Sequence, residues 1–178
     1  MAKLRMRAVL SAIAAGILIT IGGCTEQAPT SNAAPEVGAQ YQRLEVQGSA
    51  IGSAFDQSAA RVEKVIGAEG GTLEIPGGHR LTFPAGAVSA PTRIRAKVDA
   101  RYAGVELDPH GIRFPAGAEP TLTLSYAAAG PISYVNFAIL YTDVSGRFLE
   151  NMGGSVNTAN KSVSARLPHF SGYVIGAY

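Results

Sequence analysis

The sequence is poor in the residues that most often carry chemistry. It contains a single cysteine, Cys24, together with three histidines and no tryptophan. One cysteine excludes an internal disulfide and leaves no second thiol for a metal or redox pair. The lack of tryptophan removes the usual platform for stacking sugars. The chain also lacks the Gly-x-Ser-x-Gly elbow of hydrolases, the Gly-Lys-Ser or Gly-Lys-Thr phosphate loop and the His-Glu-x-x-His zinc helix.

The chain begins with a leader that is first basic and then apolar. Lys3, Arg5 and Arg7 precede the apolar run Ala8–Ile21, and small residues follow that run directly. The run is shorter than the ~20 apolar residues that a membrane-spanning helix needs. This arrangement predicts a secretory signal peptide over residues 1–23, which is processed and takes no part in the fold.

The leader ends in a motif that indicates lipid attachment. Ile21-Gly22-Gly23-Cys24 resembles the bacterial lipobox. The resemblance implies that the signal peptidase recognises Ile21, Gly22 and Gly23 and cuts before Cys24, whose thiol takes a diacylglyceryl group. Thr25 stands where, by the rule for lipoproteins of enteric bacteria, an aspartate would hold the protein in the inner membrane. We therefore expect a bacterial cell-envelope protein, anchored by lipid to the outer membrane.

Removal of the leader changes the charge balance of the chain. The leader carries three of the 15 Lys and Arg residues and none of the 13 Asp and Glu residues, so the mature chain has a net charge of −1. A chain without an excess of positive charge gives no reason to expect nucleic acid as a partner.

Residues 24–60 are predicted to form a mostly disordered tether behind the lipidated cysteine. The stretch 25–40 is rich in small and polar residues, contains two prolines and has too few large apolar groups to bury a core. The segment 50–66 could carry a helical turn around Ser58–Lys64 or begin a first strand at Arg61. We favour the strand.

Residues 61–178 are long enough for one domain with one core, and their pattern is that of strands. In Thr92–Val98, apolar or small residues alternate with charged ones, so one face is buried and the other meets water. Thr121–Tyr126 and Ser162–Leu167 alternate in the same way. Tyr134–Tyr141 is apolar on one face and mixed on the other, as in a central strand covered on both sides. Many short strands with glycine and proline turns between them indicate an all-β fold, a sandwich or small barrel, and we predict a single antiparallel β-sandwich.

One short stretch occurs twice. Leu81–Ala87 reads LTFPAGA and Ile112–Ala118 reads IRFPAGA. The proline of each copy cannot donate to a β-ladder, so it ends a strand, and the glycine then allows a turn. We expect Phe83 and Phe114 to fill the core at two equivalent corners of one sandwich. The less favoured alternative is that these loops form a ligand site, for example for carbohydrate.

The order of several stretches is similar to that of ZU5-type domains, which occur in ankyrins, netrin receptors and bacterial lipoproteins. The stretches that carry this resemblance are Val65–Leu73, Leu81–Val88, Thr92–Ile94, Leu107–Pro115 and Thr121–Tyr126. The resemblance covers about residues 61–178. It implies a β-sandwich that serves mostly in protein interaction and that has no cofactor.

The resemblance also implies one candidate reaction. Some relatives of this family cut themselves between Phe and Ser of a His-Phe-Ser motif, which His169-Phe170-Ser171 matches. In such a reaction the Ser171 hydroxyl would attack the Phe170 carbonyl carbon, giving an ester that water hydrolyses, while His169 would move the proton. A strained peptide and a donor for the oxyanion are needed as well. The alternative is a packed final strand with Phe170 pointing inward. We favour packing because the cut would release only Ser171–Tyr178.

Two further groups of residues allow a functional and a plainer interpretation. A metal site made by His110, Asp108 and His79 would need its loops to converge, and we expect neither a metal nor a cofactor. The alternating basic residues of Thr92–Val98 could meet an anionic polymer, but such charges also discourage aggregation of an exposed strand, and we favour that role.

Together these features predict a lipid-anchored interaction module of the cell envelope without enzymatic activity. Its partner would be a protein or a glycan of the envelope, and its contact with the membrane would run through the lipid on Cys24. The alternative is an autoproteolytic ZU5-like domain that cuts between Phe170 and Ser171.

Overall fold

The computed structural model describes residues 40–46, 61–133 and 136–178. The predicted signal peptide, Cys24 and most of the predicted tether lie outside these residues. Within the described ranges, no helix is both long enough and apolar enough to cross a membrane.

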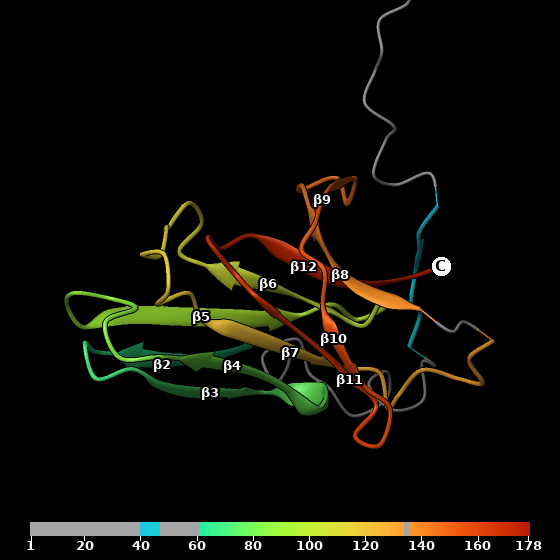
Figure 1. Ribbon diagram of the computed structural model, residues 1–178, viewed down its shortest axis with the longest axis horizontal. Coiled ribbons are helices and arrows are strands. Elements are labelled where there is room, and N and C mark those ends of the chain that lie inside the picture. The colour runs from blue at the N-terminus through green and yellow to red at the C-terminus, as the bar shows by residue number, and fades with distance from the viewer. Residues whose placement is uncertain (1–39, 47–60, 134–135) are drawn as a thin grey trace, which may run out of the picture. The chain divides into compact units, whose positions relative to one another are not determined.

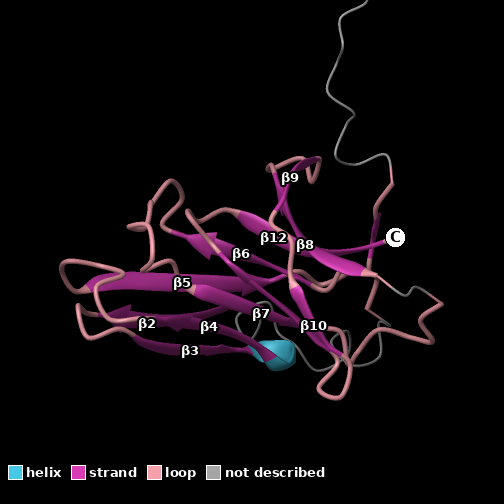
Figure 2. Ribbon diagram, in the orientation of Figure 1, coloured by secondary structure: helices cyan, strands magenta, loops and turns pink. Residues whose placement is uncertain are grey.

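The described residues form twelve β-strands and one short 3₁₀ turn, η1, at Pro76–Gly78 (Figures 1 and 2). The strands are β1 (Gln42–Arg43), β2 (Arg61–Ile66), β3 (Gly71–Ile75), β4 (His79–Phe83), β5 (Thr92–Val98), β6 (Gly104–Asp108), β7 (Thr121–Ser125), β8 (Phe137–Thr142), β9 (Phe148–Asn151), β10 (Ser155–Asn157), β11 (Ser162–Arg166) and β12 (Gly172–Ala177).

The strands make two antiparallel sheets that pack face to face. The seven-stranded sheet has the order β2-β5-β6-β12-β8-β9, with β1 added to β12. The five-stranded sheet has the order β10-β11-β7-β4-β3. Strand β12 pairs with β6 through Gly172–Val174 and with β1 through Gln42–Arg43, so β1 continues the sheet where β6 ends. The predicted all-β antiparallel sandwich is confirmed at this level.

The alternating pattern of the sequence matches the two faces of the sheets. In β5, Ile94, Ala96 and Val98 are buried, whereas the basic residues between them are exposed. In β7 and β11 the apolar positions are likewise buried and the intervening positions are not. The segment from Arg61 is strand β2, so the favoured strand interpretation is confirmed from that residue on. The helical alternative begins at Ser58, which lies outside the described residues.

Strand β8 is covered on both faces, as predicted for a central strand. Phe137 and Ile139 enter the main core between the sheets. Ala138 and Leu140 point the other way and join a small second cluster, on the outer face of the seven-stranded sheet, with Tyr41 and Val174. Residues that face outward from this sheet are therefore not all polar, and the N-terminal segment covers part of that face.

The repeated stretch forms two equivalent turns. The Ala87 N–H donates to the Pro84 carbonyl at 3.2 Å, and the Ala118 N–H donates to the Pro115 carbonyl at 2.9 Å. The glycine of each copy has a positive φ, 80° at Gly86 and 87° at Gly117, a conformation that glycine adopts without the cost of a Cβ clash.

The phenylalanines of the two turns meet in the core, as predicted. Phe83 and Phe114 are buried, with ring centroids 6.1 Å apart. Phe170 completes the group, at 6.0 Å from Phe83 and 4.9 Å from Phe114, and all three pairs are edge-to-face. This packing favours structural corners over the alternative ligand site, because the buried rings offer no face to a sugar.

Candidate functional site

The His-Phe-Ser stretch lies in the connection between β11 and β12. Strand β11 ends at Arg166 and β12 begins at Gly172, so the three residues precede the final strand instead of belonging to it. His169 forms a single β-bridge with Arg113. The stretch thus crosses from the five-stranded sheet to the seven-stranded sheet, and its backbone must leave one ladder before it joins the next.

The backbone of this connection is held on both sides. The Phe170 N–H donates to the Ile112 carbonyl at 3.2 Å, and the Leu107 N–H donates to the Ser171 carbonyl at 3.0 Å. The Phe170 carbonyl accepts from the Gly111 N–H at 3.4 Å. Phe170 itself is only 2% exposed. Burial of a side chain of this size contributes about 1.5–3 kcal/mol, so the connection is a packed part of the core.

His169 is engaged with two tyrosines. Its ring lies 4.9 Å from the Tyr141 ring, edge-on, and its Nδ1 lies 3.2 Å from the Tyr173 hydroxyl. That hydroxyl donates to the His169 carbonyl at 2.6 Å. Burial raises the pKa of the Tyr173 phenol well above its ordinary value, so the phenol keeps its proton and remains a donor. His169 is therefore oriented by Tyr141 and Tyr173.

The Ser171 hydroxyl makes no hydrogen bond to a side-chain base within the described residues. Its Oγ lies 3.5 Å from the Thr142 carbonyl, which is a long contact, and within the described ranges no ring nitrogen bonds to it. Within the described residues the Phe170 carbonyl has one donor, the Gly111 N–H, at 3.4 Å, longer than the 2.7–3.1 Å expected of an oxyanion donor. Among described non-glycine residues only Lys161 has a positive φ, so neither Phe170 nor Ser171 has that form of strain. This arrangement supports a packed connection.

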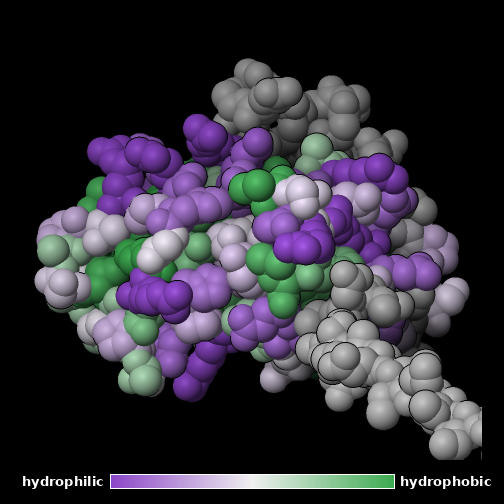
Figure 3. Space-filling model, turned by 90° about the horizontal axis from the view of Figure 1, so that it is seen from above, coloured by the Kyte–Doolittle hydropathy of each residue, from purple (hydrophilic) through white to green (hydrophobic). Residues whose placement is uncertain are grey.

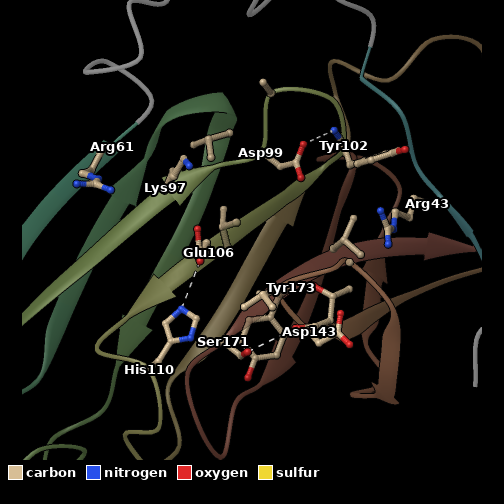
Figure 4. A pocket seen from close by; sticks show the side chains of 18 of the residues that line it. Arg43, Arg61, Lys97, Asp99, Tyr102, Glu106, His110, Asp143, Ser171 and Tyr173 are labelled. Carbon is tan, nitrogen blue, oxygen red and sulfur yellow. Dashed lines mark hydrogen bonds and ion pairs between the residues drawn. The ribbon is translucent and has the colours of Figure 1, made fainter.

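An open groove lies beside Ser171 on the outer face of the seven-stranded sheet (Figure 4). We call it the outer groove; its volume is about 1060 Å³. One wall is the β5–β6 hairpin and the other is the β8–β9 hairpin. Its floor follows one row of cross-strand partners from five strands. The row is Arg61, Lys97, Glu106, Gly172 and Thr142.

Glycine in the middle of this row keeps the floor low. A Cβ at Gly172 would lie 2.7 Å from Thr142 Oγ1, closer than such atoms approach. Side chains of neighbouring strands face each other on the same side of a sheet, and the glycine leaves room for the Thr142 side chain to lie over this position. The groove is therefore built into the register of the sheet.

The carboxylates at one end of the outer groove are already engaged. Glu63 pairs with Arg93 and also with Arg95, at 3.6 Å. Glu106 lies 3.5 Å from the Nε2 of His110. Glu63 is therefore compensated by two arginines, whereas Glu106 faces a histidine and, across the strand pair, Lys97.

The carboxylates of the two hairpins are engaged as well. Asp99 accepts from the backbone N–H of Arg101 at 2.8 Å and of Tyr102 at 2.9 Å. Asp143 accepts from the Ser145 hydroxyl at 2.6 Å and from two backbone N–H groups. The hydroxyl contact is the main reason that the pKa of Asp143 lies below its ordinary value. Both carboxylates shape their turns.

The cations of the outer groove are not neutralised in this way. Arg61 and Lys97 are direct cross-strand partners, and neither forms an ion pair within the described residues, although Glu106 is the cross-strand partner of Lys97 on its other side. Like charges in such positions destabilise a sheet. Arg43 lies over the rings of Tyr102 and Phe148, at 5.1 and 5.3 Å, and no ion pair forms on it within the described part of the chain. Figure 4 shows Arg61 beside Lys97 and Arg43 at the other end.

The next row of the sheet shows how the charges could have been balanced. There Arg95 stands between Glu63 on β2 and Asp108 on β6, so a cation has an acidic neighbour on each side. The basic residues of Thr92–Val98 thus divide into two groups. Arg93 and Arg95 are compensated by Glu63, and Lys97 opens onto the groove.

The three histidines do not form a common site. His110 lies in the turn after β6, a strand of the seven-stranded sheet, near Glu106 and Asp108 at 3.5 and 3.6 Å. His79 is in β4 of the other sheet, where it is buried and its Nδ1 accepts from the Ser125 N–H at 2.9 Å. No set of three or more His, Cys, Asp or Glu suited to a metal ion occurs in residues 40–46, 61–133 and 136–178.

Sequence reasoning missed the outer groove as a unit. It singled out Lys97 within a basic stripe and Ser171 within a candidate motif, but not Arg61 or Arg43. These residues come from four separate segments, and only strand pairing brings them together. The sequence did contain one signal for this groove. Arg61 and Lys97 both stand at outward positions of strands in which buried and exposed residues alternate.

Comparison with known proteins does not identify a family for this chain. No protein-family model matches the chain, and a search of curated proteins returns no match.

The unpaired cations predict a stabilising substitution. Arg61→Glu should raise the free energy of unfolding by about 0.2–1 kcal/mol, because it replaces a like-charged cross-strand pair with an opposite-charged one. Urea unfolding at low salt measures this gain, which should shrink as salt is added. Arg61→Gln is the control that removes the repulsion without creating a pair. A clear loss of stability in Arg61→Glu would show that Arg61 already has an acidic partner.

The buried His79 predicts a pH-dependent stability. Burial lowers its pKa from 6.5 to about 4, so the unfolded chain binds the extra proton more readily than the folded one. Stability from this group is complete above about pH 6.5 and decreases by on the order of 3 kcal/mol as the pH falls to 4. His79→Asn keeps a side-chain acceptor for Ser125 but does not titrate. Urea unfolding between pH 7.5 and 4 should show a smaller loss in this variant, and equal losses would contradict the assignment.

Proposed function

We propose that this protein is a lipid-anchored interaction module of the bacterial cell envelope and that it catalyses no reaction. The lipid on Cys24 holds it to the outer membrane, the stretch before Tyr41 acts as a tether, and the β-sandwich, to which β1 also belongs, is the ZU5-like part presented to an envelope partner. The leader and the lipobox-like Ile21-Gly22-Gly23-Cys24 support the anchor. The two packed antiparallel sheets are consistent with the ZU5-like assignment.

The observation that carries the proposal is the contrast between the two candidate regions. At His169-Phe170-Ser171 each group is used for packing or for bonds within the domain. At the outer groove, by contrast, Arg61 and Lys97 are cross-strand partners that are exposed to solvent, and neither forms an ion pair in the described ranges. Groups that keep an unfavourable like-charged contact, on a surface open to solvent, favour binding over catalysis.

The face that Figure 3 shows is mostly hydrophilic, and its hydrophobic residues form small separate groups. Large apolar patches usually mark permanent interfaces or membrane contact. Small ones fit a module that meets its partner through polar and charged groups.

The anchor predicts a defined mature chain. Protein purified from its native membrane should have the intact mass of a lipidated chain from Cys24 to Tyr178, and Cys24→Ala should carry no lipid. The same measurement tests self-cleavage, the alternative implied by the ZU5 resemblance. A wild-type chain that ends at Phe170, together with an uncut Ser171→Ala chain, would replace the interaction role with an autoproteolytic one.

The binding role predicts a partner specific to the folded domain. A tagged full-length chain, solubilised from the envelope in mild detergent, should retain at least one protein. A control chain with residues 1–60 followed by an unrelated folded domain should not retain it. Quantitative mass spectrometry of both eluates makes the comparison. Identical eluates would contradict the role of residues 61–178 as the interacting part.

A further inference from the structure

We propose that residues 41–46, which include β1, form a latch that tension on the anchor releases. When the lipid on Cys24 is pulled, this latch segment detaches and lengthens the tether, while the rest of the sandwich stays folded. The inference rests on the proposed function, because the anchor and a bound partner supply the tension. Three features support it: the contacts of the latch segment, the path of the load and the length of chain that follows.

The latch segment is docked on the seven-stranded sheet through its backbone. Strand β1 pairs with the end of β12. Beyond β1, the Leu44 N–H donates to the Ile175 carbonyl at 3.0 Å, and the Leu44 carbonyl accepts from the Ala103 N–H at 2.9 Å. The Val46 N–H donates to the Arg101 carbonyl at 2.9 Å. The segment is therefore held by a short row of bonds that follow one another along the chain.

Three side chains fix the latch segment to the domain. Leu44 and Val46 join the main core, and Tyr41 covers the outer cluster that contains Leu140. The Tyr41 hydroxyl accepts from the Asn151 amide at 2.6 Å. Detachment would expose this apolar surface to water, which favours return of the segment when tension ends. At rest the latch segment is thus part of the sandwich.

Tension on the anchor reaches the domain at the latch segment first. Cys24 is joined covalently to the domain through the residues that precede Tyr41. A load on the lipid therefore passes to Tyr41, whichever surface of the domain the partner holds. Strands further along the chain are loaded by this route only after the latch segment has detached.

The ladder between β1 and β12 is loaded from one end. The two strands are antiparallel, and the pair Gln42 and Ala177 precedes the pair Arg43 and Gly176. Figure 1 shows β1, in cyan, beside the C-terminal end of β12. When Tyr41 is pulled away from the sheet, the hydrogen bonds break one after another and do not share the load.

Strand β12 is held more firmly than β1. It pairs with β8 from Gly172 to Ala177 and with β6 from Gly172 to Val174. Its Tyr173 and Ile175 are fixed in the main core. Strand β1 has only two residues and adds to one side of β12. The load therefore separates β1 from β12 before it removes β12 from the sheet.

The rest of the sandwich depends little on the latch segment. The five-stranded sheet contains none of its residues, and β2 pairs with β5 along its whole length. Within the latch segment, Leu44 and Val46 belong to the main core, whose other described members lie between Ile66 and Ala177. Detachment therefore removes a small part of the core and leaves both sheets paired.

The chain that follows converts release into extra reach. Val46 is joined to β2 through residues 47–60. The chain from Cys24 to Tyr41 spans at most about 60 Å, and the chain from Cys24 to Arg61 spans at most about 130 Å. Release of the latch segment thus about doubles the distance from the membrane at which the domain can hold a partner.

Optical tweezers test the latch on the mature full chain, produced without lipid. Cys24 is the only cysteine of the sequence, so one DNA handle is coupled to its thiol and the other to a tag after Tyr178. Unfolding should occur in two steps. The first should release about 70 Å of contour length, the chain from Tyr41 to Arg61, and the second should release the remainder.

Two matched substitutions identify the steps. Leu44→Ala should speed the first step at a fixed force about tenfold or more, because it weakens the hold of the latch segment on the core. It should change the second step less than about twofold, because Leu44 has by then left the core. Leu122→Ala makes the same truncation at a fully buried position of β7 and should speed the second step instead.

Three results would overturn the latch. The first is a single step that releases the whole domain, about 480 Å of contour length. The second is a first step much longer than about 70 Å, since β2 would then unfold together with β1. The third is an equal effect of Leu44→Ala and Leu122→Ala on the first step.

These results are distinct from a failure of the proposed function. A chain that is lipidated in its native membrane and retains its partner, but unfolds in one step, keeps the interaction function and overturns the latch alone. A two-step record from a chain that carries no lipid in its native membrane supports the latch and contradicts the anchor.

Discussion

The register of β12 is the constraint on which the other features depend. This strand lies inside the seven-stranded sheet, and its alternate residues face opposite sides: Tyr173 and Ile175 enter the main core, while Val174 joins the outer cluster. A slip of one residue would exchange these faces and place a tyrosine in the outer cluster. The same register puts Gly172 between Glu106 and Thr142. The register that forms the core therefore also forms the outer groove.

The connection before β12 secures this register. Phe170 packs against Phe83 and Phe114, the two phenylalanines of the repeated turns, so three distant segments meet at one point. The backbone on either side of Phe170 bonds to Ile112 and Leu107. A stretch that reads like a cleavage motif therefore performs a structural task in this fold. Similar residues can serve packing in one chain and chemistry in another, since reaction requires a base and an oxyanion donor at short range.

At the outer groove, by contrast, the arrangement of charges does not favour the stability of the sheet. The row containing Arg95 alternates acidic and basic groups, as a sheet face selected for stability would. The adjacent row places Arg61 on one side of Lys97 and Glu106 on the other. A local cost of this kind on a solvent-exposed surface is understandable if the free energy is recovered on binding. The edge position of β2 keeps that cost small, because water screens both charges.

The sequence by itself determined the all-β class, the faces of β5, β7 and β11 and the central place of β8, because side chains alternate with a period of two and burial follows that period. It also identified Phe83 and Phe114 as core residues from the repeated turn. Only the tertiary structure decided that Phe170 joins them, that His79 and His110 lie on different sheets, and that Arg61, Lys97, Glu106, Gly172 and Thr142 share one row. Strand order and register depend on pairings between residues far apart in the chain, which local periodicity does not encode.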